Sequence, residues 1–311
     1  MLVLVAPGQG AQKPGFLTPW LDLPGVADRL REWSEALELD LIHYGTEADA
    51  EDIRDTAVAQ PLLVASALVS TGALLEGIRL PAAVGAVAGH SVGELAAAAT
   101  AGVFSEADAM SLVRTRGRAM ARAAAVTETG MSAVLGGDPE AVTAHLERLG
   151  LTPANINGSG QIVAAGTAEQ LAALAADRPE GTRVMPLKVA GAFHTAHMAP
   201  AVDALENAVR DVSVGSPVLP YVSNRDGLVV KSGEEVAQRL VAQVASPVRW
   251  DLCMQTFQEQ GASCMIEVCP GGTLTGLAKR GMPGVRTLAL KSPDDLDAAR
   301  ALVAEHAAAA E

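Results

Sequence analysis

The chain has 311 residues, of which 49% are hydrophobic, 19% charged and 3% aromatic, and its formal net charge is −13. A chain of this length and apolar content can bury a large core, so we expect a soluble globular protein. The acidic charge and the few aromatic side chains disfavour nucleic acids and anionic membranes as partners. Three cysteines at irregular spacing, Cys253, Cys264 and Cys269, suit reduced thiols in a core.

The first predicted element is a buried strand over residues 2–6, which starts next to the N-terminus. It has no basic leader and stops at Pro7, so it is too short for a signal peptide. Each later apolar run is interrupted by Gly, Arg or Glu before it reaches the ~18 residues that a membrane span needs. We therefore expect a cytoplasmic protein with no membrane partner.

The loop after this strand, Pro7 to Gln12, carries a glutamine between two glycines. Loops at the carboxyl ends of parallel strands line the ligand crevice of an open α/β sheet, which places Gln9 in a functional position. A plain turn remains the alternative. A dinucleotide fingerprint is disfavoured, because Lys13 occupies the place of its third glycine.

Two helices are predicted next, over residues 28–39 and 58–76, and the second is so uniformly apolar that it should flank a parallel sheet. The apolar run 82–88 then leads into Gly89-His90-Ser91-Val92-Gly93-Glu94, which is followed by a helix-forming stretch. A G-x-S-x-G segment between strand and helix is typical of a nucleophile elbow, with Ser91 beside the free N–H groups of a helix N-terminus. Taken alone, the motif is equally compatible with a simple helix cap.

The helix predicted from Glu106 to Ala125 carries an arginine on its apolar face. Arg114, Arg118 and Arg122 are spaced four residues apart and are expected to share a solvated stripe. Arg116 instead shares its face with apolar neighbours: Leu112, Val113, Ala119 and Met120. A buried guanidinium needs a partner, which is either the carboxylate of a ligand or an internal Asp or Glu.

Residues 129–191 alternate short strands and helices, which predicts a small ferredoxin-like α+β subdomain inserted into a large domain made of residues 1–128 and 192–311. The segment Asn155 to Gly160 is interpreted as a turn of this subdomain. The predicted elements are the strand 131–135, the helix 138–149, the strand 161–165, the helix 168–176 and the strand 183–187.

The chain re-enters the large domain at a loop that contains His194, ahead of a helix over residues 199–212. A histidine in a loop is freer to take part in chemistry than one on a core face. His194 and His197 lack both an intervening Glu and a third ligand, so no metal site is expected. The other histidines considered are expected at the surface: His43, His145 and His306.

The predicted helix 234–244 is broken ahead of Pro247, because the residue before a proline is pushed out of the helical region. The break should expose backbone carbonyls near Gln243. Strands are also predicted over residues 218–223, 264–268 and 285–290, and helices over 248–260, 273–280 and the acidic C-terminal tail.

Five segments, in this order along nearly the whole chain, resemble the malonyl-CoA:acyl carrier protein transacylase family. Each segment alone is weak evidence for the family, whereas all five in this order are specific for it. Arg116 follows Ser91 by 25 positions, the spacing found in the family, so the resemblance selects the same arginine as the helical periodicity. The segments are Gly8-Gln9-Gly10-Ala11-Gln12, Gly89-His90-Ser91-Val92-Gly93-Glu94, Arg114-Thr115-Arg116-Gly117, Gly191-Ala192-Phe193-His194 and Pro247-Val248-Arg249-Trp250.

The resemblance implies an α/β-hydrolase-like large domain and a ping-pong transfer of malonyl from malonyl-CoA to the phosphopantetheine thiol of an acyl carrier protein, for fatty-acid or polyketide synthesis. Ser91 would be the nucleophile and His194 its base, oriented by a carbonyl at or near Gln243. The N–H groups of Gln9 and Val92 would bind the oxyanion. The remaining implied substrate-binding residues are Arg116, Phe193, His90, Gln243 and Asn157.

In this interpretation Arg116 clamps the malonyl carboxylate, and the bulk of Phe193 favours malonyl over methylmalonyl. No separate cofactor is expected, because the CoA thioester and phosphopantetheine arrive with the substrates, and the protein is expected to be a monomer. An acidic carrier requires a local basic patch on this acidic chain. The candidates for that patch are Arg183, Lys188, Lys279 and Arg280.

Two other classes of function remain as alternatives. A serine thioesterase or lipase-like hydrolase would share the elbow, but α/β-hydrolases place the histidine near the C-terminus after an Asp, whereas His194 is mid-chain. The chain also lacks the His-Gly-Gly-Gly oxyanion segment of lipases. A non-catalytic carrier-binding module is disfavoured by the presence of Ser91, His194, Gln9 and Arg116 together.

Overall fold

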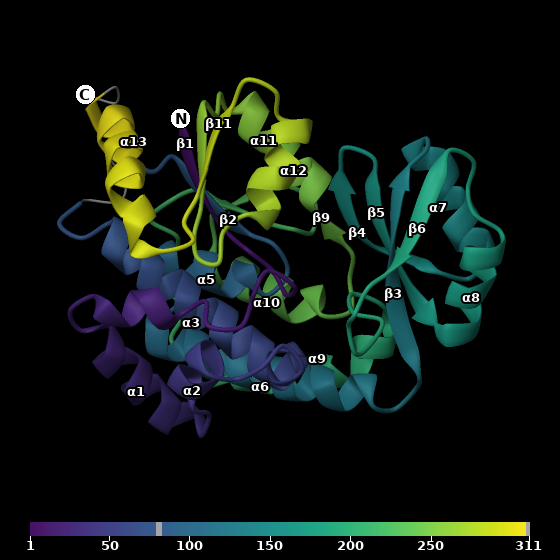
Figure 1. Ribbon diagram of the computed structural model, residues 1–311, viewed down its shortest axis with the longest axis horizontal. Helices are drawn as coiled ribbons and strands as arrows, with labels where there is room; N and C mark the ends of the chain where they lie inside the picture. The colour runs from purple at the N-terminus through teal and green to yellow at the C-terminus, as the bar shows by residue number, and fades with distance from the viewer. Residues whose placement is uncertain (79–82, 309–311) are drawn as a thin grey trace.

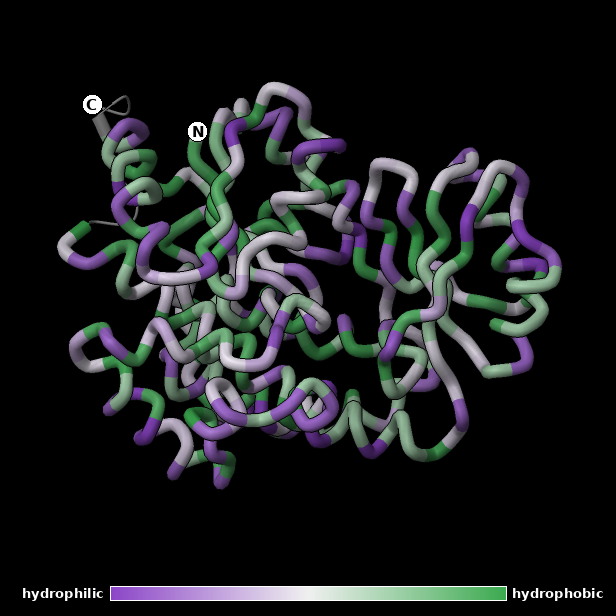
Figure 2. Tube along the Cα trace, in the orientation of Figure 1, coloured by the Kyte–Doolittle hydropathy of each residue, from purple (hydrophilic) through white to green (hydrophobic). Residues whose placement is uncertain are grey.

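The computed structural model describes residues 1–78 and 83–308, so the first residue of the predicted run 82–88 and the last three of the predicted tail lie outside it. Two lobes are visible in Figure 1, each built around its own sheet, with six strands in the larger lobe and five in the smaller. Hydrophobic residues gather on the strands and inner helices of the larger lobe, and hydrophilic ones on the outer turns (Figure 2).

The larger sheet is mixed, with a parallel core. Its strands lie in the order β11-β10-β1-β2-β7-β8, and the only antiparallel pair described in it is β7 with β8. This confirms the predicted α/β class with a parallel sheet. The strand bounds are Leu2–Ala6 (β1), Ala86–Gly89 (β2), Tyr221–Val222 (β7), Val229–Val230 (β8), Cys264–Glu267 (β10) and Arg286–Ala289 (β11).

Helices cover both faces of this sheet (Figure 1). Along β1 the side chains alternate: Leu2 and Leu4 belong to the core formed with α3, α5 and α6, and Val3 and Val5 to the core formed with α11 and α12. The three cysteines are buried, as predicted. The α-helices of this lobe are α1 (Val26–Leu37), α2 (Leu41–Thr46), α3 (Thr56–Leu74), α5 (Gly93–Thr100), α6 (Glu106–Ala124), α9 (Ala199–Arg210), α10 (Gly233–Gln243), α11 (Trp250–Glu259), α12 (Thr273–Gly281) and α13 (Leu296–Ala308).

Helix α3 corrects one expectation from the sequence. Its 19 residues are long and apolar enough to cross a membrane, with a mean hydropathy of 1.6 over its most apolar window, although no run of that kind was expected. In the fold 78% of this window is buried, and the helix packs against α5 and α6. Helix α3 is apolar around most of its circumference because it lies in the core, where other parts of the protein surround it.

The smaller sheet has the order β6-β3-β5-β4-β9, with α7 and α8 packed against it. Its first four strands in chain order are connected as β-α-β-β-α-β and pair antiparallel, and β9 adds to β4 in parallel. The bounds are Thr129–Gly136 (β3), Pro139–Arg148 (α7), Thr152–Gly158 (β4), Gln161–Thr167 (β5), Ala168–Ala176 (α8), Thr182–Pro186 (β6) and Val248–Arg249 (β9).

Strands β4 and β9 were not predicted. The segment interpreted as a turn from Asn155 to Gly160 is the end of β4, and only Ser159 and Gly160 form the turn. Its polar residues suggest a loop, but pairing with strands on both sides decides the conformation. Residues 248–249 were expected to start a helix but form β9. This strand follows α10 in the chain and pairs with β4 of the small sheet.

Smaller differences have local causes. Strand β7 is shorter than the predicted 218–223, since Pro220 supplies no N–H for a ladder, and β8 was not predicted. Arg114 is not part of a solvated stripe, because its guanidinium donates to the carbonyls of Leu37 and Ala57. His145 was expected at the surface but is 9% exposed, and its Nε2 lies 2.7 Å from the carbonyl oxygen of Asp177.

Candidate active site

Ser91 stands on a sharp turn between β2 and α5. Its φ is +54°, a left-handed conformation that few residues other than glycine adopt. The turn packs so tightly that a Cβ on Gly89 would lie 2.0 Å from the carbonyl carbon of Gly93, and one on Gly93 would lie 2.3 Å from the carbonyl oxygen of Ala6. The two glycines of the motif are therefore required by close backbone approach, in agreement with an elbow.

A side chain that the sequence did not single out holds the elbow in place. Asn224, fully buried, accepts a hydrogen bond from the Ser91 N–H at 2.8 Å and donates one to the Gly89 carbonyl at 2.7 Å. The available signal was its position, directly after a predicted strand and so at the sheet edge where the crevice was expected. The bond to Asn224 occupies the Ser91 N–H, which is thereby withdrawn from any role toward a ligand.

Two other backbone N–H groups lie near Ser91, those of Val92 and Gln9. Val92 is the N-cap of α5, and neither its N–H nor that of Gln9 has an acceptor among the described residues. Parallel pairing of β1 with β2 aligns Ala6 with Gly89, which brings the loop containing Gln9 beside the elbow. A Cβ on Gly8 would lie 2.9 Å from His90, so glycine permits this approach. Two such donors, one of them at a helix N-terminus, can bind an oxyanion.

His194 contacts Ser91 directly. Its Nε2 lies 2.7 Å from the Ser91 Oγ, and its Nδ1 donates to the backbone carbonyl of Gln243 at 2.8 Å. The carbonyl accepts only, so Nδ1 carries the proton and Nε2 is left to accept the proton of Ser91. Burial, and then the positive charge of Arg116, lower the pKa of His194 to about 3, which keeps the imidazole neutral as a base must be.

The Gln243 carbonyl is available because α10 ends at this residue. Last-turn carbonyls have no intrahelical donor, and the negative end of the helix dipole lies here. The predicted break ahead of Pro247 thus supplies the acceptor that an aspartate provides in a Ser-His-Asp triad. The partial charge would favour a transient imidazolium on His194 by roughly 1 kcal/mol.

Arg116 is 2% exposed and points at Ser91. It donates to the amide oxygens of Gln60 at 2.7 Å and Gln243 at 2.8 Å, and lies 3.4 Å from the Ser91 Oγ. Within the described part of the chain it forms no ion pair with a carboxylate inside 4.0 Å, so the alternative of an internal salt bridge is not realised. Burial lowers the pKa of Arg116 to about 10. A buried cation held by neutral amides can still bind an anionic ligand.

The remaining candidates lie close by. The His90 Nε2 and the Asn157 Oδ1 are 2.9 Å apart, which links the elbow to β4 of the smaller sheet. Phe193 is 6% exposed and precedes His194 in the same loop. Gln243 is 5% exposed, and its side chain donates to the Ser91 carbonyl at 3.0 Å and also to the carboxylate of Glu94. Glu94 and Gln60 were not predicted, since nothing in the local sequence marks their partners.

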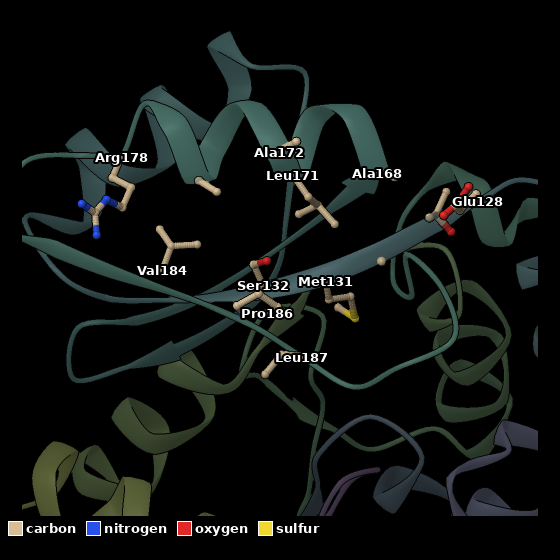
Figure 3. Close-up of a pocket in the computed structure, with 13 residues that line it drawn as sticks. Glu128, Met131, Ser132, Ala168, Leu171, Ala172, Arg178, Val184, Pro186 and Leu187 are labelled. Carbon is tan, nitrogen blue, oxygen red and sulfur yellow. The ribbon is translucent and has the colours of Figure 1, made fainter. Parts of the chain in front are cut away.

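A separate cavity of about 430 Å³ lies in the smaller lobe, away from these residues. Helix α8 covers it with Leu171 and Ala172, and Met131 and Ser132 of β3 lie on the opposite side (Figure 3). None of the residues described around Ser91 lines it. The described residues hold no group of three or more His, Cys, Asp or Glu side chains that could bind a metal ion.

Comparisons with known proteins agree with this geometry. The family model described as "Acyl transferase domain" matches residues 3–298. A curated protein of Mycobacterium tuberculosis named "Malonyl CoA-acyl carrier protein transacylase" is 51% identical over 297 residues, which cover 96% of this chain and 98% of that protein. The crystal structure of MCAT from M. tuberculosis has a TM-score of 0.91 and 50% identity, covering 96% of this chain and 99% of the other.

Another similar solved structure is a complex, described as a type II PKS acyl-carrier protein with its malonyl-transacylase. It has a TM-score of 0.89 and 32% identity, and covers 96% of this chain and 99% of that one. The matched regions include every residue placed around Ser91 above, from Gln9 to Gln243. The chain therefore belongs to the acyl transferase domain family, within the malonyl CoA-acyl carrier protein transacylases.

Proposed function

We propose that this enzyme moves malonyl from malonyl-CoA to the phosphopantetheine thiol of an acyl carrier protein, through a covalent intermediate on Ser91. The observation that carries the proposal is the convergence of a serine–histidine pair and a buried, carboxylate-free arginine on one oxygen atom. A covalent intermediate divides a transfer between two large carriers into two steps at one site. The curated relatives' names, and the complex with a carrier protein, support the same substrates.

In the first step the Ser91 Oγ attacks the thioester carbonyl while His194 Nε2 takes the hydroxyl proton. The tetrahedral oxyanion is bound by the N–H groups of Val92 and Gln9, each contributing roughly 3 kcal/mol to lowering the barrier. The C–S bond then breaks, and the departing CoA sulfur takes the proton from His194. In the second step His194 deprotonates the carrier thiol, which attacks the ester, and the proton returns to Ser91.

Arg116 selects the acyl group in this proposal. Its guanidinium fork donates two charge-assisted hydrogen bonds to the free malonyl carboxylate and so fixes the thioester carbon over Ser91. Phe193 limits the space at the α-carbon and favours malonyl over methylmalonyl. Equal turnover of the two CoA esters would contradict that assignment of Phe193. His90, Asn157 and Gln243 complete the walls of the site.

Intact mass spectrometry after mixing with malonyl-CoA tests the proposal. The protein should gain the mass of one malonyl group and release CoA, and the Ser91→Ala variant should gain nothing. The adduct should persist in water and be discharged rapidly by holo carrier protein. Loss of the adduct to water at the same rate without carrier would identify a hydrolase. A protein that forms no adduct and releases no CoA would be a non-catalytic binding module.

The carrier is expected to dock on basic side chains, because carriers of this kind are acidic. The candidates Arg183, Lys188, Lys279 and Arg280 are all exposed. Reversing Lys188 and Arg280 together, to glutamate, should slow discharge of the adduct to the carrier by about tenfold through the association rate. Acylation by malonyl-CoA and discharge by a small thiol should not change. If discharge to the carrier is also unchanged, these residues are not part of the docking surface.

We further propose that residues 1–128 and 192–311 form an α/β-hydrolase-like large domain, which lends strand β9 to the smaller sheet. Residues 129–191 form a ferredoxin-like subdomain, on the strength of the β-α-β-β-α-β connectivity of that sheet. The enzyme is proposed to be a cytoplasmic monomer that needs no resident cofactor. It would serve fatty-acid or polyketide synthesis.

A further inference from the structure

Glu94 is a buried carboxyl group that the proposed mechanism does not use. It is the second residue of α5, three positions after Ser91, and it is 1% exposed. Burial raises the pKa of Glu94 to about 7, although several hydrogen bonds to its carboxylate oppose the shift. A buried carboxyl group is costly unless its oxygens are paired, so its partners indicate what it stabilises.

Each oxygen of Glu94 accepts from a residue that contacts Ser91. The Oε1 accepts from the backbone N–H of Asn224 at 2.6 Å, and Asn224 in turn binds the Ser91 N–H. The Oε2 accepts from the side-chain amide of Gln243, which also donates to the Ser91 carbonyl. One carboxylate thus ties together both side chains that hold the backbone of the nucleophile.

The Gln243 amide lies between an acceptor and a donor. When Glu94 is ionised, its carboxylate only accepts hydrogen bonds, and a guanidinium only donates them. The amide nitrogen must therefore face Glu94, and the oxygen must face Arg116, whose NH2 group lies 2.8 Å from it. With the amide reversed, nitrogen would face the guanidinium and oxygen would face the carboxylate, and both contacts would be repulsive.

We propose that Glu94 is a positioning residue that fixes the polarity of the Gln243 amide and thereby holds Arg116 in place for the malonyl carboxylate. The intervening amide keeps the carboxylate of Glu94 out of direct contact with the guanidinium. Arg116 is consequently anchored without a direct ion pair to Glu94, so its remaining N–H groups stay available to the substrate. This inference rests on the proposed role of Arg116 in malonyl binding.

The Glu94→Gln variant separates this role from simple packing, because an amide of the same shape offers one acceptor where the carboxylate offers two. Either Gln243 or Asn224 must lose its acceptor. Loss at Gln243 leaves its amide nitrogen held by the Ser91 carbonyl alone, so the side chain that accepts from Arg116 is held less firmly. We expect kcat/KM for malonyl-CoA to fall about 10- to 100-fold relative to acetyl-CoA, as for one lost hydrogen bond to a charged group.

A double-mutant cycle with Gln243→Ala shows whether Glu94 acts through Gln243. In the Gln243→Ala background, Glu94→Gln should change the malonyl-to-acetyl ratio by less than about twofold. The matched control is Glu169→Gln, at the second residue of α8, where the side chain is exposed and the ratio should not change. Equal losses for both CoA esters, or full additivity in the cycle, would overturn the proposal.

Should Glu94→Gln fail to fold, a neutron structure of the wild-type protein decides the same question. Deuterium on the Gln243 nitrogen must point at Glu94, and a nitrogen facing Arg116 would overturn the proposal. Formation of the wild-type malonyl adduct is measured in parallel. An absent adduct refutes the transferase mechanism itself, whereas an adduct with an unchanged ratio in Glu94→Gln refutes only the role of Glu94.

Discussion

Removing Ser91 or His194 should lower kcat for malonyl transfer by roughly 10⁴- to 10⁶-fold, and removing both should cost scarcely more than removing one. The reason is that the two side chains act as a unit, joined by the 2.7 Å contact between Oγ and Nε2. The Ser91→Ala, His194→Ala and double variants can be compared by single-turnover release of CoA. Residual activity should come from the oxyanion N–H groups and Arg116, which are intact in all three.

His197→Ala is the matched control for these variants. It lies three residues beyond His194 in the same loop region, is half-buried, and makes no described contact with Ser91. Its activity should stay within about twofold of wild type, as for a substitution outside the site. If the losses of Ser91→Ala and His194→Ala multiplied in the double variant, the two residues would be acting independently, contrary to the dyad.

The Arg116→Ala variant should lose malonyl specificity. We expect kcat/KM for malonyl-CoA to fall roughly 10²- to 10⁴-fold, because two charge-assisted hydrogen bonds to the substrate are removed. Acetyl-CoA has no carboxylate to bind, so its transfer should be preserved or rise. Steady-state rates with both esters give the ratio of kcat/KM for malonyl-CoA to that for acetyl-CoA. The ratio for Arg116→Lys should lie between those of wild type and Arg116→Ala, since lysine keeps the charge but lacks the guanidinium fork.

Arg118→Ala controls for the loss of a cation from the same helix. The Arg118 side chain is 42% exposed and lies 3.9 Å from the Glu38 carboxylate, on the opposite side from Ser91 in helical phase. The ratio of kcat/KM for malonyl-CoA to that for acetyl-CoA should be close to the wild-type value, and so should the stability of the fold. Equal losses of malonyl and acetyl transfer in Arg116→Ala would mean that Arg116 supports the packing of Gln60 and Gln243 and does not bind the substrate.

The parts of the site that could be predicted from sequence are those with a local signal. Helical periodicity alone places Arg116 on the buried face of α6, and it is buried there while Arg118 and Arg122 are not. The elbow follows from two glycines around a serine. The exposed carbonyl at Gln243 follows from Pro247, which has no N–H to continue the helix. Each of these signals lies within a single short segment of the chain.

The parts that could not be predicted depend on pairing across the chain. Asn224 reaches the Ser91 N–H over 133 positions, and Gln243 reaches Glu94 over 149. The sequence around Asn224 indicates only a polar turn, and the sequence around Gln243 indicates only the end of a helix. Neither indicates these distant partners. Strand β4 was interpreted as a turn for the same reason, because its partners β5 and β9 lie on either side of it and β9 comes from a distant segment. Tertiary pairing overrides local preference in such cases.

The oxygen that orients His194 belongs to the peptide backbone at Gln243 and not to its side chain. Every amino acid at position 243 supplies that same carbonyl, so the orienting group has no side chain that mutagenesis can delete. It also has no proton to gain or lose in the physiological range, in contrast to the aspartate of a triad. The tautomer of His194 is therefore insensitive to the residue at 243 for as long as α10 keeps its end, and variants at 243 report on the contacts of its side chain with Arg116, Ser91 and Glu94.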